Sequence, residues 1–233
     1  MRGGIVTVEL AREHKVRPTY YAAALDLKGK LCAVIGGGIV AERKLKGLLE
    51  GGADRVRLVS PAVTPGIAAL ADGGNIILEQ RAYQESDLAN VWLVFACTDD
   101  AMLNAAIALA ANRRRIWCNV TDDAASGSFI SPSVVRRGDL LLAVTASGAS
   151  PSLSALIRTE LERQYGPQYK ERVERLRQLR EYVYKTQKNE RVRREVLRLA
   201  AEGTLMDDGA AGTLGLDEWY AVLLEITIGR QME

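Results

Sequence analysis

A run of three glycines, Gly36-Gly37-Gly38, could hold a phosphate group, because glycine lets a ligand approach the backbone closely. The run follows the apolar segment 31–35 and precedes a stretch with helical apolar spacing, so it predicts a strand, a tight turn and a helix N-terminus. With Ala41 the spacing is Gly-x-Gly-x-x-Ala, which favours a site for the pyrophosphate of a dinucleotide such as NAD. A turn that joins strand and helix without a ligand is the alternative.

Three further segments follow predicted strands, where the ligands of a doubly wound sheet bind. They are Ser60-Pro61-Ala62-Val63, Thr98-Asp99-Asp100 and 119–123. The second strand is followed by Ser60 and Pro61 rather than by the acid that often holds the ribose of NAD. Backbone groups of residues 61–63 would therefore have to hold the ribose instead. The spacing does not choose between NAD and NADP.

Two pairs of acids in these segments favour different roles. Thr98 or Asp99 is expected to cap the next helix, with contact between Thr98 and the cofactor as the alternative. Asp122 and Asp123 precede a loop of small residues, so no helix there needs a cap. Since no histidine or reactive cysteine is available nearby, a carboxylate of this pair is the best candidate proton acceptor.

The composition excludes several classes of function. The 233 residues carry a net charge of +2, three cysteines in apolar runs and one histidine, His14, so a histidine triad or a multi-histidine metal site is excluded, and we predict no metal. The apolar runs are too short to span a bilayer, and charged residues interrupt the N-terminal segment where a signal peptide would lie. We therefore expect a cytoplasmic protein without a membrane partner.

The order of elements predicts an α/β fold: a Rossmann-like doubly wound parallel sheet followed by a helical dimerisation and C-terminal region. We expect an NAD-binding domain over 1–145, a dimerisation and active-site segment over 146–168, and a C-terminal helical region over 169–233. Predicted strands cover 31–35, 56–59, 75–80, 91–97, 116–120 and 140–145.

The predicted helices after residue 150 form the basic part of the chain. Ser150 suits an N-cap and Pro151 a first helical position, and the small residues before them could bind an anion or form an ordinary linker. Farther on, narrow apolar stripes such as Val173, Leu176, Leu179 and Val183 suit packing against a partner, which makes a homodimer plausible. We expect a flexible linker over 203–215 and a short terminal helix from Leu216.

These motifs, in this order, resemble the precorrin-2 dehydrogenases of siroheme synthesis, including the N-terminal module of siroheme synthase. The resemblance spans about residues 20–167, and its motifs are LDLKGK, VIGGGIVAERK, ACTDD, CNVTD, SFISPS and SGASP. It implies NAD-dependent oxidation of precorrin-2 to sirohydrochlorin by a homodimer, and some family members also insert ferrous iron. We expect no methyltransferase domain of the fused enzyme in these 233 residues.

The resemblance also implies roles for single residues. Asp122 matches the catalytic acid of the Asn-Val-x-Asp motif and would accept the proton, and the family's cofactor contacts map to Ile39, Val40, Ala62 and Val63. The position of Gly36, Gly38, Ser60, Pro61 and Thr98 after the predicted strands makes them further candidates to contact the cofactor. Asn119, Ser147, Ser150, Arg136, Arg137 and Arg158 are candidates to bind the carboxylates of the tetrapyrrole. Ala146 stands where some siroheme synthases carry the first of two paired serines, so we do not expect a role tied to that serine here.

Two functions of other classes compete with this interpretation. A non-catalytic NAD-sensing regulatory module shares the glycine turn, but it normally has an acid after the second strand and lacks the Asn-Val-x-Asp and Ser-Gly-x-Ser-Pro motifs. Nucleic-acid binding through the basic helices is disfavoured, because glutamates are interspersed and aromatic residues are few.

Overall fold

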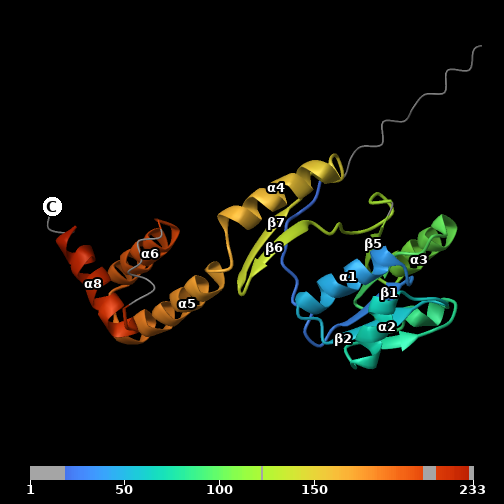
Figure 1. Cartoon of the computed structure of the whole chain (residues 1–233), viewed down its shortest axis with the longest axis horizontal. Coiled ribbons are helices and arrows are strands. Elements are labelled where there is room, and N and C mark those ends of the chain that lie inside the picture. Colours follow the sequence, from blue (N-terminus) through green and yellow to red (C-terminus); the bar gives the residue numbers. More distant parts are fainter. Residues whose placement is uncertain (1–18, 122, 207–213, 231–233) are drawn as a thin grey trace, which may run out of the picture. The chain divides into compact units, whose positions relative to one another are not determined.

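The structure is a computed structural model that describes residues 19–121, 123–206 and 214–230. The chain divides into two compact units, Met1–Ser131 and Pro132–Glu233. The first unit contains β1 (Leu31–Ile35), α1 (Ile39–Glu50), β2 (Arg55–Val59), α2 (Pro65–Asp72), β3 (Ile77–Glu79), a short 3-10 helix η1 (Glu85–Leu88), β4 (Leu93–Ala96), α3 (Ala101–Arg113) and β5 (Trp117–Val120) (Figure 1).

The strands of the first unit form a parallel sheet in the order β3-β2-β1-β4-β5. The chain starts in the middle at β1, builds outward through β2 and β3, and returns to the other side of β1 for β4 and β5. The direction of winding therefore reverses between β1 and β4, which is where doubly wound sheets bind ligands. The predicted Rossmann-like fold is confirmed.

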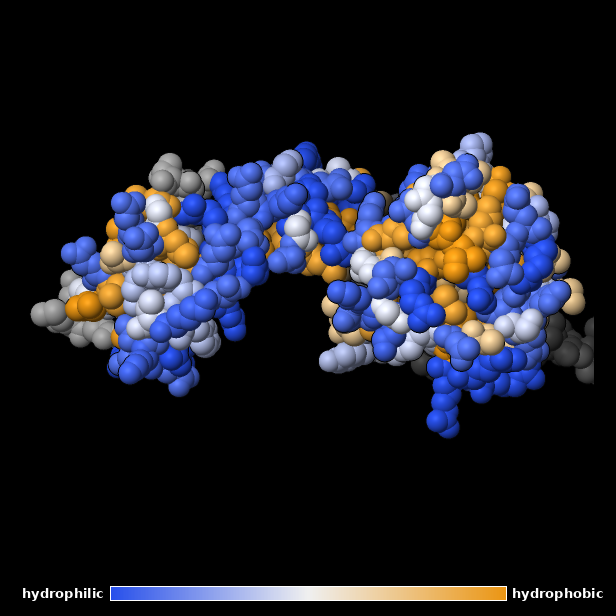
Figure 2. Space-filling model, turned by 90° about the horizontal axis from the view of Figure 1, so that it is seen from below, coloured by the Kyte–Doolittle hydropathy of each residue, from blue (hydrophilic) through white to orange (hydrophobic). Residues whose placement is uncertain are grey.

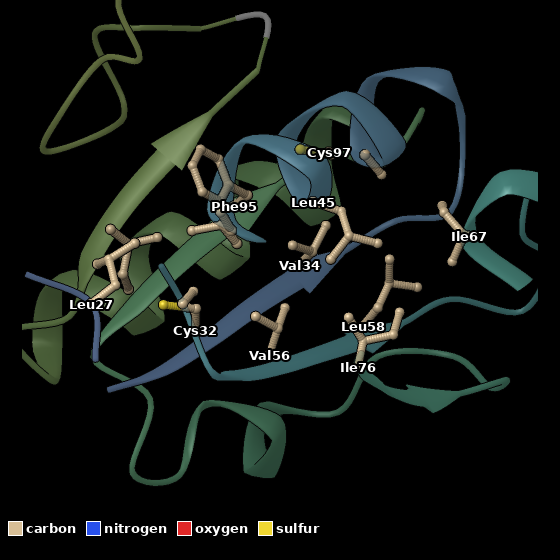
Figure 3. Packing of buried hydrophobic residues seen from close by; sticks show 14 residues of the cluster. Leu27, Cys32, Val34, Leu45, Val56, Leu58, Ile67, Ile76, Phe95 and Cys97 are labelled. Carbon is tan, nitrogen blue, oxygen red and sulfur yellow. The ribbon is translucent and has the colours of Figure 1, made fainter. Parts of the chain in front are cut away.

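Both faces of this sheet are buried, because alternate residues of each strand point toward opposite helix layers. On one face Val34 packs with Leu45 of α1 and Ile67 of α2 (Figure 3). On the other face Ile35 packs in a cluster that includes Ile107 of α3. These two layers fix the end of β1, from which the glycine turn leaves.

The second unit contains a two-stranded sheet and helices. Its elements are β6 (Ser133–Arg137), β7 (Leu140–Val144), α4 (Pro151–Gln164), α5 (Tyr169–Thr186), α6 (Glu190–Met206) and α8 (Leu216–Gly229) (Figure 1). The prediction that 140–145 extends the parallel sheet is wrong: this strand pairs antiparallel with β6. The reason is the two-residue turn Gly138-Asp139, in which Gly138 has a φ of 60° and folds the strands into a hairpin.

The apolar stripes of α5, α6 and α8 pack on one another. Leu179 and Val183 of α5, Val196 of α6 and Trp219 of α8 belong to one buried cluster, so these stripes are not left free for a partner as predicted. The predicted linker over 203–215 is wrong at its start, because α6 continues through Gly203 to Met206; residues 207–213 lie outside the described residues. On the face shown in Figure 2, hydrophilic residues cover most of these helices.

The helices among the described residues include none long and apolar enough to cross a membrane. The same residues include no group of three or more His, Cys, Asp and Glu side chains placed to hold a metal ion.

Candidate functional site

The glycine turn is fixed by the strands on either side of β1. The Gly36 N–H donates to Val59 O at the end of β2, over 3.0 Å. A Cβ on Gly36 would lie 2.4 Å from Cys97 O, just after β4, and its φ is +122°. Only glycine tolerates both the positive φ and the lack of space for a Cβ at this position. These contacts place the turn between the ends of β2 and β4.

The loop after β2 lies directly against this turn. The Thr64 N–H donates to Gly37 O over 3.0 Å, and a Cβ on Gly37 would lie 1.9 Å from Ala62 O. Ser60 uses its hydroxyl inside the loop, donating to Ala62 O over 2.7 Å. The structure therefore brings the predicted segments 36–40 and 60–63 together through main-chain atoms.

Side chains in the two segments divide between core and surface. Val40 and Val63 are half-buried against the core of the first unit, whereas Ile39 is 81% exposed and Pro61 and Ala62 are exposed. The exposed members are the ones whose side chains are accessible to a cofactor.

Thr64 and Glu42 add a contact that the sequence did not predict. The Thr64 hydroxyl donates to Glu42 Oε2 over 2.5 Å, and Lys46 Nζ donates to the other oxygen over 2.6 Å. These two hydrogen bonds, with that from Lys46 the larger effect, lower the pKa of Glu42. The carboxylate is thus held ionised and ties α1 to the start of α2, whose N-cap is Thr64.

The first turn of α1 suits a phosphate group. Gly38 is the N-cap of α1, has no side chain to bond the free N–H groups, and faces open space where a Cβ would meet no atom within 4 Å. A helix N-terminus without a side-chain cap leaves N–H donors and the positive end of the helix dipole for an anion. The residues present therefore fit the pyrophosphate of a dinucleotide.

Thr98 lies beside this turn and is clamped by a residue that the sequence analysis missed. The Thr98 N–H and hydroxyl both donate to Asn104 Oδ1, over 3.1 and 2.7 Å, and Asn104 Nδ2 donates to Thr98 O over 3.0 Å. Asn104 is only 4% exposed. A buried amide needs hydrogen-bond partners, so an asparagine on the buried face of a helix was the feature of the sequence that could have predicted this contact.

The cap of α3 differs from the prediction. Asp100, rather than Thr98 or Asp99, is the N-cap, and its Oδ1 accepts from the N–H groups of Met102 and Leu103 over 2.8 and 3.0 Å. The hydroxyl of Thr98 donates to Asn104 and accepts from Asp100 N, so it bonds the residue at the cap rather than the N–H groups of the first helical turn.

A cavity of about 180 Å³ opens at the ends of β4 and β5. Its lining residues come from both strand ends and from α3: Thr98, Asp99, Ala101, Asn104, Ala105, Val120, Asp123 and Ser126. Asp122 lies outside the described residues. Its neighbour Thr121 donates its N–H to Ala96 O over 3.1 Å, and Asp123 lines the cavity. Asp123 itself accepts hydrogen bonds from Ala125 N and Ser126 Oγ within its own loop.

Asn119 holds the loop that follows Asp122. Its side chain is 4% exposed, and its Nδ2 donates to Phe129 O over 3.0 Å. Its Oδ1 has no hydrogen-bond partner among the described residues. Ser128 fastens the same loop, because its Oγ accepts from Cys118 N over 2.8 Å. The predicted contact of Asn119 with substrate remains a prediction, while anchoring is what its geometry provides.

The serines predicted to bind substrate lie at the start of α4. Ser150 is the N-cap, as predicted, and its Oγ accepts from Leu153 N over 3.2 Å. Ser147 has a φ of 52° and donates its N–H to Thr145 Oγ1 over 3.0 Å. Buried Ser154, which was not predicted, accepts from Ala146 N over 3.1 Å and so fixes this loop.

The predicted arginines differ in what they contact. Arg137 Nε donates to Tyr165 O over 2.9 Å, so this side chain satisfies the C-terminal end of α4. Arg158 forms an ion pair with Glu162 one turn along the same helix. Arg136 lies exposed on β6. Of the three, Arg136 is the one with no side-chain bond to the described residues.

The cysteines are confirmed as buried core residues. All three are buried thiols rather than disulfides. Burial raises the pKa of Cys32 to about 11, with a smaller effect of Asp54, and raises that of Cys118 to about 11, with a smaller effect of Cys97. At neutral pH these two thiols are therefore protonated and are poor nucleophiles.

Comparisons with known proteins agree with this geometry. A family model described as "Putative NAD(P)-binding" matches residues 23–133. The siroheme synthases of Escherichia coli and Shigella boydii are each 43% identical over 137 residues, 59% of this chain and 30% of the relative. The chain thus spans under a third of the length of these relatives.

A solved structure covers more of the molecule. "SirC, precorrin-2 dehydrogenase" aligns with a TM-score of 0.70 and 25% identity over 88% of this chain and 100% of that chain. The resemblance predicted from the motifs is thereby confirmed, and it extends beyond residue 167.

Proposed function

We infer that this chain belongs to the precorrin-2 dehydrogenase family and oxidises precorrin-2 to sirohydrochlorin with a nicotinamide dinucleotide. The observation that carries this proposal is the uncapped, open helix N-terminus at Gly38, beside the winding reversal of the sheet. The similarity to siroheme synthases and to SirC supports the choice of substrate.

The reaction removes a hydride and a proton from the substrate. A bound nicotinamide supplies the hydride acceptor. The residues of the chain would supply position and a base: Gly38, the N-cap of α1, and the first turn of α1 would hold the pyrophosphate, and Thr98, fixed by Asn104, would border the cofactor. We propose that Asp122 accepts the proton; in support, Thr121 on one side bonds Ala96 at the end of β4, and Asp123 on the other side lines the cavity.

We propose NAD rather than NADP as the cofactor. The loop after β2, residues 60–64, contains no lysine or arginine that could pair with a 2′-phosphate. The measurement is the ratio of kcat/KM for the two cofactors, which we expect to favour NAD. A higher value for NADP would overturn this choice.

The second unit supports a homodimer. α4 leaves Leu153, Leu156 and Ile157 exposed at 50%, 70% and 37%, and the hairpin leaves Val134 and Leu141 exposed at 41% and 38%. Apolar groups gathered on neighbouring elements are typical of an interface. Leu156→Lys should convert the dimer to monomers in analytical ultracentrifugation, whereas a dimer of unchanged affinity would place the interface elsewhere.

Insertion of ferrous iron into the product is a separate proposal, supported by the family resemblance. Asp122 would accept the pyrrole protons as the iron substrate enters. Formation of siroheme from sirohydrochlorin and ferrous iron, compared with the rate without protein, tests it independently of the oxidation. We also propose a cytoplasmic location, with no nucleic acid or membrane as partner.

The central experiment is anaerobic turnover of precorrin-2. Wild-type protein with NAD should produce NADH and the absorbance of sirohydrochlorin, while binding of NAD without turnover would favour a sensing module. Asp122→Asn should lower kcat by about 10²- to 10⁴-fold, as expected for loss of a general base, and leave NAD binding intact. Asp72→Asn, an exposed acid at the end of α2, is the matched control. Wild-type turnover by the Asp122 variant would remove it from the mechanism.

A further inference from the structure

The C-terminal helices enclose a second cavity, distinct from the one at the strand ends. It has a volume of about 270 Å³, lies between α6 and α8, and is lined by Arg191, Arg194, Glu195, Thr227 and Arg230. We propose that this cavity, the arginine cavity, binds a small multivalent oxyanion through its guanidinium groups.

The charges around the arginine cavity are unbalanced. Three arginines line it and Glu195 is the single acid among its lining residues. That carboxylate is already engaged: Arg198 Nε donates to Glu195 Oε2 over 3.0 Å, and Arg230 Nη1 lies 3.8 Å from Oε1. Hydrogen bonding from Arg198, followed by the charges of Arg198, Arg230 and Arg191, lowers the pKa of Glu195, so it stays ionised.

Among the described residues, the guanidinium groups of Arg191 and Arg194 make no bond that holds the fold. Neither guanidinium has a hydrogen bond or ion pair within the part of the chain that the structure describes, and both side chains are exposed. The buried cluster of this unit uses other positions of α6, such as Val196 and Leu199. Apart from the attraction between Arg191 and Glu195, their positive charge is therefore available to a ligand.

The position of these arginines is unfavourable without an anion. α6 begins at Glu190, so both lie in its first two turns, where the helix dipole is positive and disfavours cations. Asn189 Oδ1 already caps the helix by accepting from Arg191 N and Val192 N over 3.0 and 3.3 Å. Like charges three residues apart also repel each other on a helix face. A bound anion would offset both effects.

The chemistry of the cavity selects a fully deprotonated acceptor. Guanidinium groups only donate, and their planar fork matches the oxygens of a phosphate or a carboxylate. Thr227 is fully buried, and its hydroxyl donates a hydrogen bond to Leu223 O over 2.8 Å, so it offers no donor to the ligand. Phosphate and carboxylate share this chemistry, and the experiment separates them.

The test is calorimetric titration of the full-length protein with inorganic pyrophosphate and, separately, with citrate, at constant ionic strength. We expect saturable binding of at least one anion and at least a tenfold weakening in R191Q/R194Q. The variant R163Q/K170Q changes the charge of exposed residues on α4 and α5 by the same amount and should bind as the wild type does.

The results distinguish a phosphate ligand from a carboxylate ligand, and two of them would overturn the proposal. Loss confined to pyrophosphate identifies a phosphate ligand, and loss confined to citrate identifies a carboxylate. Equal binding by the wild type and R191Q/R194Q overturns the proposal, because any remaining pyrophosphate binding then belongs to the glycine turn. Absence of saturable binding by the wild type overturns it too. Circular dichroism checks that the variants fold, and R230Q provides a second test on another helix.

Discussion

Gly38→Ala should separate cofactor binding from folding. Gly38 has ordinary extended backbone angles, φ −81° and ψ −176°, and a Cβ there would meet no atom within 4 Å. The added methyl group should therefore meet no clash and lower the free energy of unfolding by only about 0.5–1 kcal/mol, the cost of alanine at an N-cap. It would instead fill the space in which a pyrophosphate approaches the first turn of α1.

The expected loss of affinity follows from the contacts that the methyl group displaces. A hydrogen bond to a charged group contributes about 1.5–3 kcal/mol, and loss of one weakens binding roughly 10- to 100-fold, at about 1.4 kcal/mol per tenfold. The assay is titration of NAD monitored by protein fluorescence, with kcat/KM measured in parallel. NAD affinity equal to that of the wild type would refute the placement of the pyrophosphate at Gly38.

Two neighbouring glycines serve as controls. Gly47→Ala lies on the same helix, also meets no atom, and should add about 0.5–1 kcal/mol of stability without affecting NAD affinity. Gly37→Ala would place a Cβ 1.9 Å from Ala62 O and should cost about 1–3 kcal/mol of stability through overpacking. If all three variants had the same NAD affinity and the same free energy of unfolding, the space around each glycine would not explain why the turn consists of glycines.

The remaining predictions concern buried polar groups. Asn104→Leu removes three hydrogen bonds to Thr98 and should destabilise the fold by about 2–4 kcal/mol and raise the KM for NAD, as thermal melts and kinetics would show; an unchanged melting temperature would contradict it. Asp87 has its pKa lowered chiefly by hydrogen bonds from Arg81, so its stabilisation is present above about pH 4 and is lost as the pH falls through its folded pKa. Asp87→Asn should lower the free energy of unfolding by about 1–3 kcal/mol at pH 7 and weaken its dependence on acid pH, measured by urea titrations. Identical pH profiles of the wild type and the variant would show that the pair of Asp87 and Arg81 is not the source of this dependence.

Local patterns predicted the elements that depend on neighbouring residues. The glycine turn, the helix start at Ser150 and the central strands follow from short-range spacing, and the structure has them where expected. The hairpin was missed although Gly138-Asp139 between two apolar runs is a recognised turn signal. Apolar alternation alone does not reveal which sheet a strand joins.

Contacts between distant residues were not predictable in the same way. An arginine fits a ligand carboxylate and a backbone carbonyl equally well, and only the fold shows that Arg137 donates to Tyr165 O. The clamp of Asn104 on Thr98 and the bond between Thr64 and Glu42 likewise depend on how elements are brought together. Residue type predicts what a side chain can bond, whereas packing decides with what it does bond.

The main-chain contacts between the glycine turn and the loop after β2 make cofactor preference adjustable by engineering. Main-chain atoms, Thr64 N, Gly37 O and Ala62 O, make the contacts of this junction. The side chains of Pro61 and Ala62 are exposed and make none of these contacts. An arginine introduced at either position would add a partner for a 2′-phosphate without altering the backbone that holds the pyrophosphate. The junction thus keeps recognition of phosphate separate from recognition of ribose, and the second can be redesigned while the first is preserved.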